Sequence, residues 1–285
     1  MKIYNFCIIT LLAFSLVACG QGKTAKEKIM QVSSYWDSFD FKDTTLIDNP
    51  GITEPKFVQF CKIIEKMSPE ERTMEVDSFL SRSKRGSEGM FWGMVNLAEK
   101  YLADPNSPCR NEESFISFLE YIDAAKDIDS LHKERPRFLL HQAKMNRLGT
   151  KATDFTYVTR EGKKGTLGTI KTRYTLLYFN NPDCHDCARV MGYLEASNVY
   201  TEMVKKHSLT ILAVYPDNVM TSWDKHKSEY PVTWIVARCK DIKSKELYSL
   251  PAIPSLYLLD RNKKVLVKDG TVEDIEDYLR NINKR

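Results

Sequence analysis

Two cysteines separated by two residues, Cys184 and Cys187, stand between an apolar segment and a helical pattern. The apolar segment, residues 174–180, is rich in aromatic side chains and is typical of a buried central strand. A cysteine at the start of the following helix meets free backbone N–H groups and the positive end of the helix dipole, which favour its thiolate. The pattern therefore predicts a strand-to-helix junction that presents a reactive thiol.

The segment after Lys151 alternates between strand and helix patterns. We predict strands at residues 154–158, 174–180, 209–215, 254–259 and 264–267, and helices from near Cys184, at 199–206, at 223–229 and after a cap at Thr271. Strand–helix–strand followed by a hairpin and a helix indicates a compact α/β arrangement. We therefore expect residues 150–285 to form an α/β domain whose central sheet is flanked by helices.

The preceding segment, residues 31–149, carries only helical patterns. Ser68 begins a capping box, a proline-rich turn at 104–108 ends an apolar stripe, and a last helix is expected at about 135–149. These signals predict a smaller all-α domain. Its apolar stripes are typical of core packing, and no catalytic constellation is evident among them.

The first residues are typical of an exported protein. One basic residue, Lys2, precedes an apolar run at 6–17 that is too short to span a bilayer and ends in small side chains. The Leu-Val-Ala-Cys sequence ending at Cys19 resembles the bacterial lipobox, which implies cleavage before this cysteine and lipid on it; the alternative is an ordinary signal peptide. We therefore expect residues 1–18 to be a lipoprotein signal peptide and residues 19–30 to be a lipid-anchored tether.

This prediction places the mature protein in the cell envelope of a Gram-negative-type bacterium, lipid-anchored and facing the periplasm, where disulfides persist. Removal of Cys7 and lipidation of Cys19 leave an odd number of cysteines, so at least one thiol is unpaired. A bridge between Cys61 and Cys109 is one option, and quiet buried thiols are the other. The formal net charge of +4 is spread over interleaved basic and acidic residues, so no nucleic-acid surface is expected.

A C-x-x-C pair can bind a metal, staple the fold or exchange electrons. The sequence holds no second such pair, and His207 and His226 lack ligand spacing, so we expect no metal site. A disulfide across so short a loop would add little stability, because the entropic gain grows with loop length. Redox exchange is the role that is left, with Cys184–Cys187 as a redox-active disulfide and no other cofactor.

Residues 150–285 resemble the thioredoxin-like domain of TlpA/ResA-type proteins, the anchored thiol-disulfide oxidoreductases of bacterial envelopes. The motif Pro-Asp-Cys-His-Asp-Cys, the downstream segment 250–260 and the order of the elements between them carry this resemblance. It implies that Pro254 is cis beside the cysteine pair and that the backbone of Ile253 binds an incoming peptide. Residues 31–149 resemble a helical domain found ahead of such modules in related lipoproteins, whose role we do not predict.

Some positions depart from the family pattern. Asp183 stands where the family has tryptophan, Tyr178 where thioredoxin has a buried acid, and Val190 where ResA has a glutamate. A protonated His185 would favour the thiolate of the first cysteine, whereas Asp183 and Asp186 would oppose it by like charge. We assign these three neighbours to tuning of the thiol pKa, and their opposite signs leave the direction of electron flow open.

The resulting hypothesis is an enzyme that exchanges the disulfides of extracytoplasmic proteins, with net reduction or isomerisation favoured by the resemblance. Cys184 would attack through a mixed disulfide and Cys187 would resolve it. The expected partners are protein thiols and disulfides of the cell envelope, an unidentified electron donor, and the membrane through the N-terminal lipid. The alternative is a partner-binding envelope lipoprotein whose thioredoxin-like domain is a redox sensor or scaffold.

Overall fold

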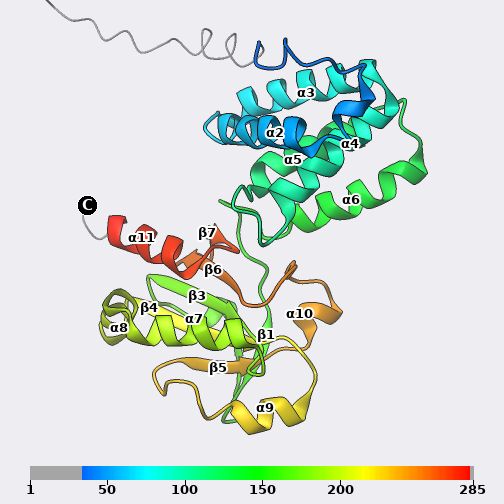
Figure 1. Cartoon of the computed structure of the whole chain (residues 1–285). Helices are drawn as coiled ribbons and strands as arrows, with labels where there is room; N and C mark the ends of the chain where they lie inside the picture. The colour runs from blue at the N-terminus through cyan, green and yellow to red at the C-terminus, as the bar shows by residue number, and fades with distance from the viewer. Residues whose placement is uncertain (1–33, 283–285) are drawn as a thin grey trace, which may run out of the picture.

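The computed structural model of the chain describes residues 34–282, which form a helical part and an α/β part (Figure 1). The expected signal peptide, Cys19 and the tether at 19–30 lie outside these residues. Within the described range, no helix is both long enough and apolar enough to cross a membrane. The segment that connects the two parts runs from the end of the last helix at Lys144 to the first strand at Thr156, and it contains the boundary expected at residue 149.

The helical part confirms the all-α prediction. Its elements within the described residues are η1 (Thr44–Leu46), α2 (Pro50–Ile64), α3 (Pro69–Gly86), α4 (Glu88–Ala98), η2 (Glu99–Ala103), α5 (Glu112–Ala124) and α6 (Ser130–Lys144). The capping box at the start of α3 is present. Ser68 Oγ accepts the Glu71 N–H at 3.3 Å, and the Glu71 carboxylate accepts the Ser68 N–H at 3.0 Å. This reciprocal pair fixes where α3 begins.

The last helix of this part differs from the prediction. It spans Ser130–Lys144 rather than about 135–149. Asp129 caps it, because its carboxylate accepts two backbone N–H groups of the first turn, at 2.9 and 3.1 Å. Beyond the last turn, Asn146 adopts the left-handed conformation, with φ of 47°. The cap and this turn set the two ends, and apolar periodicity alone does not show either of them.

Aromatic side chains fill the core of the helical part. Phe79 of α3 is 1% exposed, and its ring centroid lies 4.8 Å from that of Trp36 and 4.9 Å from that of Phe60. The rings of Phe57 and Phe118 lie 6.0 and 6.1 Å from it. Full burial of a side chain of this size stabilises a fold by about 1.5–3 kcal/mol. The cluster therefore joins α2, α3 and α5 into one core.

A mixed seven-stranded sheet forms the centre of the α/β part, in the order β2-β1-β5-β4-β3-β6-β7. The strands are β1 (Thr156–Thr159), β2 (Lys164–Thr166), β3 (Tyr174–Phe179), β4 (Leu209–Tyr215), β5 (Ile235–Arg238), β6 (Ser255–Asp260) and β7 (Val265–Lys268). The fully buried β3 is parallel to β4 and antiparallel to β6. The strand predicted before the cysteine pair is therefore the central one.

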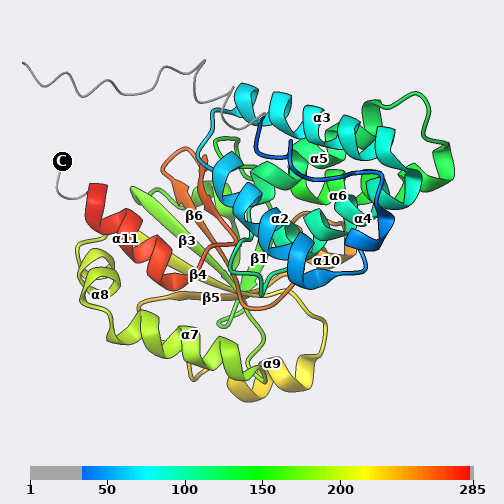
Figure 2. The ribbon, with the colours of Figure 1, turned by 45° about the horizontal axis from the view of Figure 1, so that its top comes forward.

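Helices pack on both faces of this sheet (Figure 2). They are η3 (Leu167–Thr169), α7 (His185–Ala196), α8 (Asn198–Lys205), α9 (Met220–His226), α10 (Asp241–Ser244) and α11 (Val272–Ile282). Leu176 of β3 belongs to the core cluster shared with α7, α8 and α11, whereas Leu177 belongs to the cluster shared with η3 and α10. Alternate residues of a strand point to opposite faces, so β3 contributes to both cores. The predicted sheet flanked by helices is confirmed.

Four short elements of the α/β part were not predicted. β2 and η3 are each only three residues long, and α10 is four residues long. β5 is a four-residue apolar run that pairs in parallel with β4 and antiparallel with β1. The helix predicted at 223–229 is also shifted, because α9 begins at Met220. Such short elements are defined by the strands and helices they pack against, and their own sequences carry little signal.

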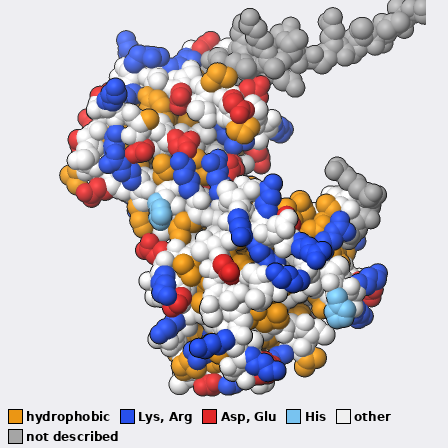
Figure 3. Space-filling view, turned by 180° about the vertical axis from the view of Figure 1, so that it is seen from behind, with side chains coloured by type: hydrophobic (Ala, Val, Ile, Leu, Met, Phe, Trp, Pro, Cys, Tyr) orange, Lys and Arg blue, Asp and Glu red, His pale blue; other side chains and the backbone are white. Residues whose placement is uncertain are grey.

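Among residues 34–282, two ion pairs connect the helical part to the α/β part. Lys268 Nζ of β7 lies 2.7 Å from the Glu112 carboxylate of α5 and donates to the Ala143 carbonyl at 2.7 Å, and only 3% of the Lys268 side chain is exposed. Arg110 lies 2.5 Å from Asp269. Burial lowers the pKa of Lys268 and raises the pKa of Glu112, against their mutual attraction. Seen from behind, the two lobes meet across a narrower region (Figure 3).

Candidate active site

Cys184 is the N-cap residue of α7, directly after the turn that follows β3. Its Sγ accepts the Cys187 N–H at 3.4 Å, and its thiol points to the carbonyl oxygen of Ile253, 3.7 Å away. The side chain is partly exposed. The sulfur therefore lies at the positive end of a helix, with a backbone N–H group directed at it.

Cys187 lies one turn further along α7 and is only 2% exposed. Its Sγ accepts the backbone N–H of Asn181 at 3.4 Å. Burial raises the pKa of the Cys187 thiol, and the hydrogen bond from Asn181 opposes that change. Both cysteines are free thiols in the structure. The pair is therefore unequal, with one thiol open at the helix start and one buried and protonated.

The loop before β6 lies against the first cysteine. The Ile253–Pro254 peptide bond is cis, as predicted. The Ile253 carbonyl is the group that the Cys184 thiol approaches at 3.7 Å, and both loop residues are half-buried. The structure thus brings together the cysteine pair and the downstream Ile-Pro segment that the sequence analysis placed beside it.

Asp183 points toward α9. Its carboxylate accepts a hydrogen bond from the Ser222 hydroxyl and lies 3.3 Å from Nε2 of His226. His226 also lies 2.8 Å from Glu229. From the sequence, His226 was weighed only as a metal ligand, and nothing links it to Asp183, which lies in a separate segment of the chain. When protonated, His226 offsets the Asp183 charge, which weakens the like-charge opposition expected next to Cys184.

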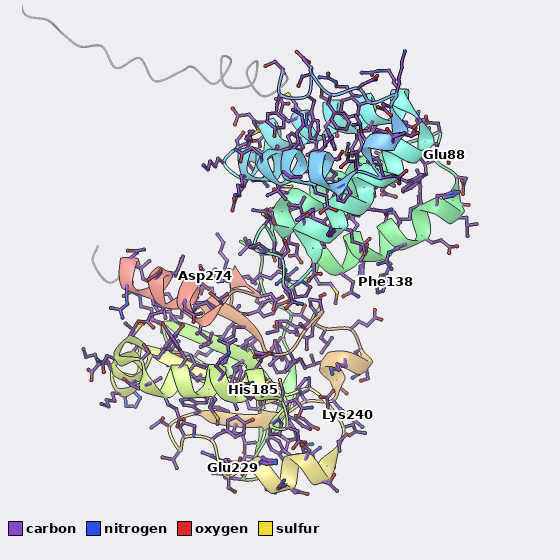
Figure 4. The ribbon with its side chains drawn as sticks, viewed as in Figure 1. Glu88, Phe138, His185, Glu229, Lys240 and Asp274 are labelled. Carbon is purple, nitrogen blue, oxygen red and sulfur yellow. The ribbon has the colours of Figure 1, made fainter. Side chains whose placement is uncertain are left out.

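The two residues between the cysteines are exposed. His185, labelled in Figure 4, is the first residue of α7, and its side chain forms no hydrogen bond or ion pair with another described residue. Asp186 lies 3.6 Å from Arg189 on the same helix. Its negative charge is among the causes that raise the pKa of Cys187, after the larger effect of burial. Asp186 therefore influences the pKa of the buried Cys187 thiol, although in the sequence it is also close to Cys184.

Buried tyrosines stand behind the cysteine pair. The Tyr178 hydroxyl donates to the Cys187 carbonyl at 2.6 Å, the Tyr230 hydroxyl donates to Asn180 Oδ1 at 2.5 Å, and Asn180 Nδ2 donates to the Tyr178 carbonyl at 2.9 Å. Burial raises the pKa of both phenols, so they stay neutral donors. From the sequence, Tyr178 is notable only because it stands where thioredoxin has a buried acid. The hydrogen bond from Tyr178 to the Cys187 carbonyl, and the one from Tyr230 to Asn180, are evident only from the folded structure.

The remaining described cysteines, Cys61, Cys109 and Cys239, are free thiols outside the C-x-x-C motif. Cys239 is 5% exposed and belongs to the core cluster on the other face of the sheet from Cys187. Cys61 and Cys109 are free thiols, so the bridge that the sequence left open is not formed in the structure. Burial raises the pKa of Cys61 and of Cys239. Among the described residues, no group of three or more His, Cys, Asp or Glu side chains could hold a metal ion.

An unequal thiol pair at the start of a helix, beside an X-Pro loop on a mixed sheet, defines the thioredoxin-like class. A family described as thioredoxin-like matches residues 172–265, and a domain of unknown function, DUF5106, matches residues 24–146. The crystal structure of a thioredoxin-like protein from Bacteroides caccae has a TM-score of 0.86 and 36% sequence identity, covering 98% of this chain and 99% of that one. The chain therefore belongs to the thioredoxin-like family.

The C-terminal half is also similar to proteins named thiol-disulfide oxidoreductase ResA. The relative from Bacillus cereus is 28% identical over 148 residues, which cover 51% of this chain and 83% of the relative. The relative from Geobacillus kaustophilus is 26% identical over 138 residues, which cover 47% of this chain and 78% of the relative. The predicted TlpA/ResA type, and with it the class of thiol-disulfide oxidoreductases, is confirmed.

The difference between the two thiols predicts selective alkylation. In the reduced protein, iodoacetamide at about pH 8 should modify Cys184 and leave Cys187 unmodified, because the thiolate is the reacting species and Cys187 is buried. Since the Cys187 pKa is raised, its modification should appear only above the ordinary thiol range of about 8.5. Peptide mapping by mass spectrometry distinguishes the two sites. Earlier modification of Cys187 would contradict the unequal pair.

Proposed function

We propose that this chain is an extracytoplasmic, membrane-anchored thiol-disulfide oxidoreductase that acts on protein disulfides through Cys184 and Cys187, with net reduction or isomerisation as its work. The observation that carries the proposal is the unequal pair. Cys184 is partly exposed at the helix start, 3.7 Å from the Ile253 carbonyl, whereas Cys187 is buried. Such an arrangement suits attack by the first sulfur and resolution by the second.

In the proposed cycle, the Cys184 thiolate attacks one sulfur of a substrate disulfide. The S–S bond between Cys184 and the substrate forms as the substrate's own S–S bond breaks, and the second substrate sulfur leaves as a thiolate that takes up a proton. Cys187 then loses its proton and attacks Cys184 Sγ, and the first substrate sulfur leaves and is protonated. The substrate gains two electrons and two protons, the pair becomes a disulfide, and a dithiol donor reduces it again. In isomerisation, another substrate cysteine releases Cys184, and no donor is needed.

Charge supports this order of events. Burial is the main cause that raises the pKa of Cys187, and the charge of an ionised Cys184 adds to it. Once Cys184 is in a mixed disulfide, that added charge is gone, so Cys187 ionises more easily than it does beside a Cys184 thiolate. Reaction of the attacking thiol therefore favours ionisation of the resolving thiol, while burial of Cys187 still opposes it.

Catalysed reduction of insulin by dithiothreitol tests whether the chain is an enzyme that exchanges protein disulfides. We expect the full chain to accelerate the reaction and the Cys184→Ser variant to lose the acceleration. An inactive wild type whose cysteine pair titrates reversibly against glutathione would overturn the proposal and favour a redox sensor or scaffold, the alternative from the sequence analysis.

The membrane anchor is tested separately. Lipidation is proposed at Cys19, and changing Cys19 to Ala should move the protein from the membrane fraction to the soluble fraction or leave the precursor unprocessed. A Cys239→Ala variant, which alters a buried thiol, is the matched control and should fractionate like the wild type. A Cys19→Ala protein that is processed and stays in the membrane fraction would show that the anchor proposal is wrong.

A further inference from the structure

A groove runs along the junction of the two parts. One wall is the turn at residues 105–110 of the helical part, between η2 and α5. The facing side consists of the loop at 252–254, the first turns of α7, and the turn from β7 into α11 at 269–274. Asp274, labelled in Figure 4, marks the α11 end of this side. The groove has a volume of about 650 Å³, within the range of clefts that bind ligands.

The groove leads to the reacting sulfur. Ile253 and Pro254 line it, and the Ile253 carbonyl oxygen is 3.7 Å from Cys184 Sγ. Asp186, on the first turn of α7, lines it as well. A substrate chain that crosses this loop to bring its disulfide to Cys184 extends along the groove and passes the turn at 105–110. The helical part therefore borders the path of the substrate.

Local hydrogen bonds fix the backbone of this turn. Ser107 Oγ donates to the Tyr101 carbonyl at 2.6 Å, and the Arg110 N–H donates to the Ser107 carbonyl at 3.1 Å. Where the turn ends, the Asn111 N–H donates to the Leu102 carbonyl at 3.0 Å. With its backbone groups paired in this way, the turn presents a preorganised wall to the groove.

A single carboxylate joins this wall to the loop beside the cysteines. The Arg110 guanidinium lies 2.5 Å from Oδ2 of Asp269, and the Ser255 hydroxyl donates to Oδ1 of the same residue at 2.5 Å. The Asp269 side chain is only 9% exposed. Ser255 directly follows Pro254. Asp269 is therefore bound both by the turn of the helical part, through Arg110, and by the end of the loop that faces Cys184, through Ser255.

The groove has an excess of negative charge. Its lining holds five carboxylates and three basic side chains, and each basic side chain faces a carboxylate. These pairs are Arg110 with Asp269, Arg189 with Asp186, and Lys268 with Glu112. Glu273 and Asp274, at the start of α11, have no basic partner among the described side chains that surround them. A basic side chain of a substrate would complement them.

We propose that the helical domain forms one wall of the substrate groove, and that the groove selects an extended peptide segment with basic residues beside the substrate cysteine. This role rests on the exchange function proposed above for Cys184. It gives the helical domain, in which the sequence shows no catalytic group, a part in choosing the substrate.

Filling the groove should separate peptide substrates from small ones. Asn106 and Pro108 are exposed and line it, so Asn106→Trp and Pro108→Trp place a large ring in the path of the substrate. The probes are the disulfide-linked dimer of a ten-residue peptide with lysines beside its cysteine, and bis(2-hydroxyethyl) disulfide. We expect the rate constant of the reduced full chain to fall about tenfold or more for the peptide, since misplacement of reacting groups is costly. The small disulfide should react as with the wild type.

A matched control tests whether tryptophan itself is the cause. Lys66 is exposed in the turn after α2, outside the groove, and Lys66→Trp should leave both rate constants unchanged. Unchanged peptide rates in Asn106→Trp and Pro108→Trp, with an active wild type, would overturn the role of the helical wall. A wild type that reacts with neither probe would instead overturn the exchange function on which that role rests.

The preference of the groove for basic peptides is tested with separate peptides and variants. Peptides with lysine or glutamate beside the cysteine are compared, each rate constant being divided by that of dithiothreitol with the same peptide to remove differences in intrinsic reactivity. The lysine peptide should react about tenfold faster at low salt, and this preference should shrink at high salt. Glu273→Lys should reduce the preference, whereas Asp277→Lys, exposed on α11 outside the groove, should keep it. Equal rates for the two peptides would overturn the basic preference.

Discussion

The Cys187→Ser variant should accumulate mixed disulfides with envelope proteins, and the Cys184→Ser variant should form none. Cys184 Sγ is partly exposed at the start of α7, so it can attack a substrate, whereas Cys187 is 2% exposed and is needed to release the adduct. Turnover in disulfide reduction should fall about a thousandfold or more in either variant, because reduction needs the two thiols as a unit. Non-reducing gels would show the adducts, and mass spectrometry would identify the cysteine that carries them.

A third variant tests whether the adducts depend on the cysteine pair and not on another cysteine. Cys239 is buried on the other face of the sheet, so Cys239→Ser should trap nothing and should keep wild-type turnover. It is a matched control for the loss of a cysteine as such. Adducts in the Cys184→Ser variant would reverse the roles of the pair or bring another thiol into the reaction. The absence of adducts from every variant would argue against attack on protein disulfides.

The parts of the site that the sequence predicted depend on neighbours along the chain. The apolar segment before Cys184, the helix after it and the Ile253–Pro254 pair before a strand are each defined within a few residues. The spacing of apolar residues and the change from a strand pattern to a helix pattern are sufficient to predict such elements. A central strand, for example, is continuously apolar because both of its faces are buried. The position of the cysteine at the helix start then follows from the order of the elements.

The parts that were missed depend on residues that only the fold brings together. Ser222, whose hydroxyl binds Asp183, is 39 residues away in the sequence, and Asp269 is 159 residues from Arg110. A serine or an arginine in a polar segment carries no signal of such a partner. For the same reason β5, whose register is set by pairing with β4 and β1, was not predicted from its four residues. The groove wall belongs to this group, since it exists only where the two parts meet.

Replacing Phe79 with Ala should destabilise the helical domain by about 3–5 kcal/mol, the usual cost of removing a fully buried aromatic side chain. Phe79 is 1% exposed, and its ring lies within 6.1 Å of the rings of Trp36, Phe57, Phe60 and Phe118, measured between centroids. These partners come from α2, α5 and the segment before η1, so the cavity cannot close without moving several elements. Urea unfolding followed by tryptophan fluorescence measures the change, since Trp36 borders the cavity.

Phe138→Ala is the matched control, because it removes the same side chain from a position that is 56% exposed. It should change the free energy of unfolding by no more than about 0.5 kcal/mol. Equal losses of stability in both variants would show that the aromatic cluster is not the centre of this core.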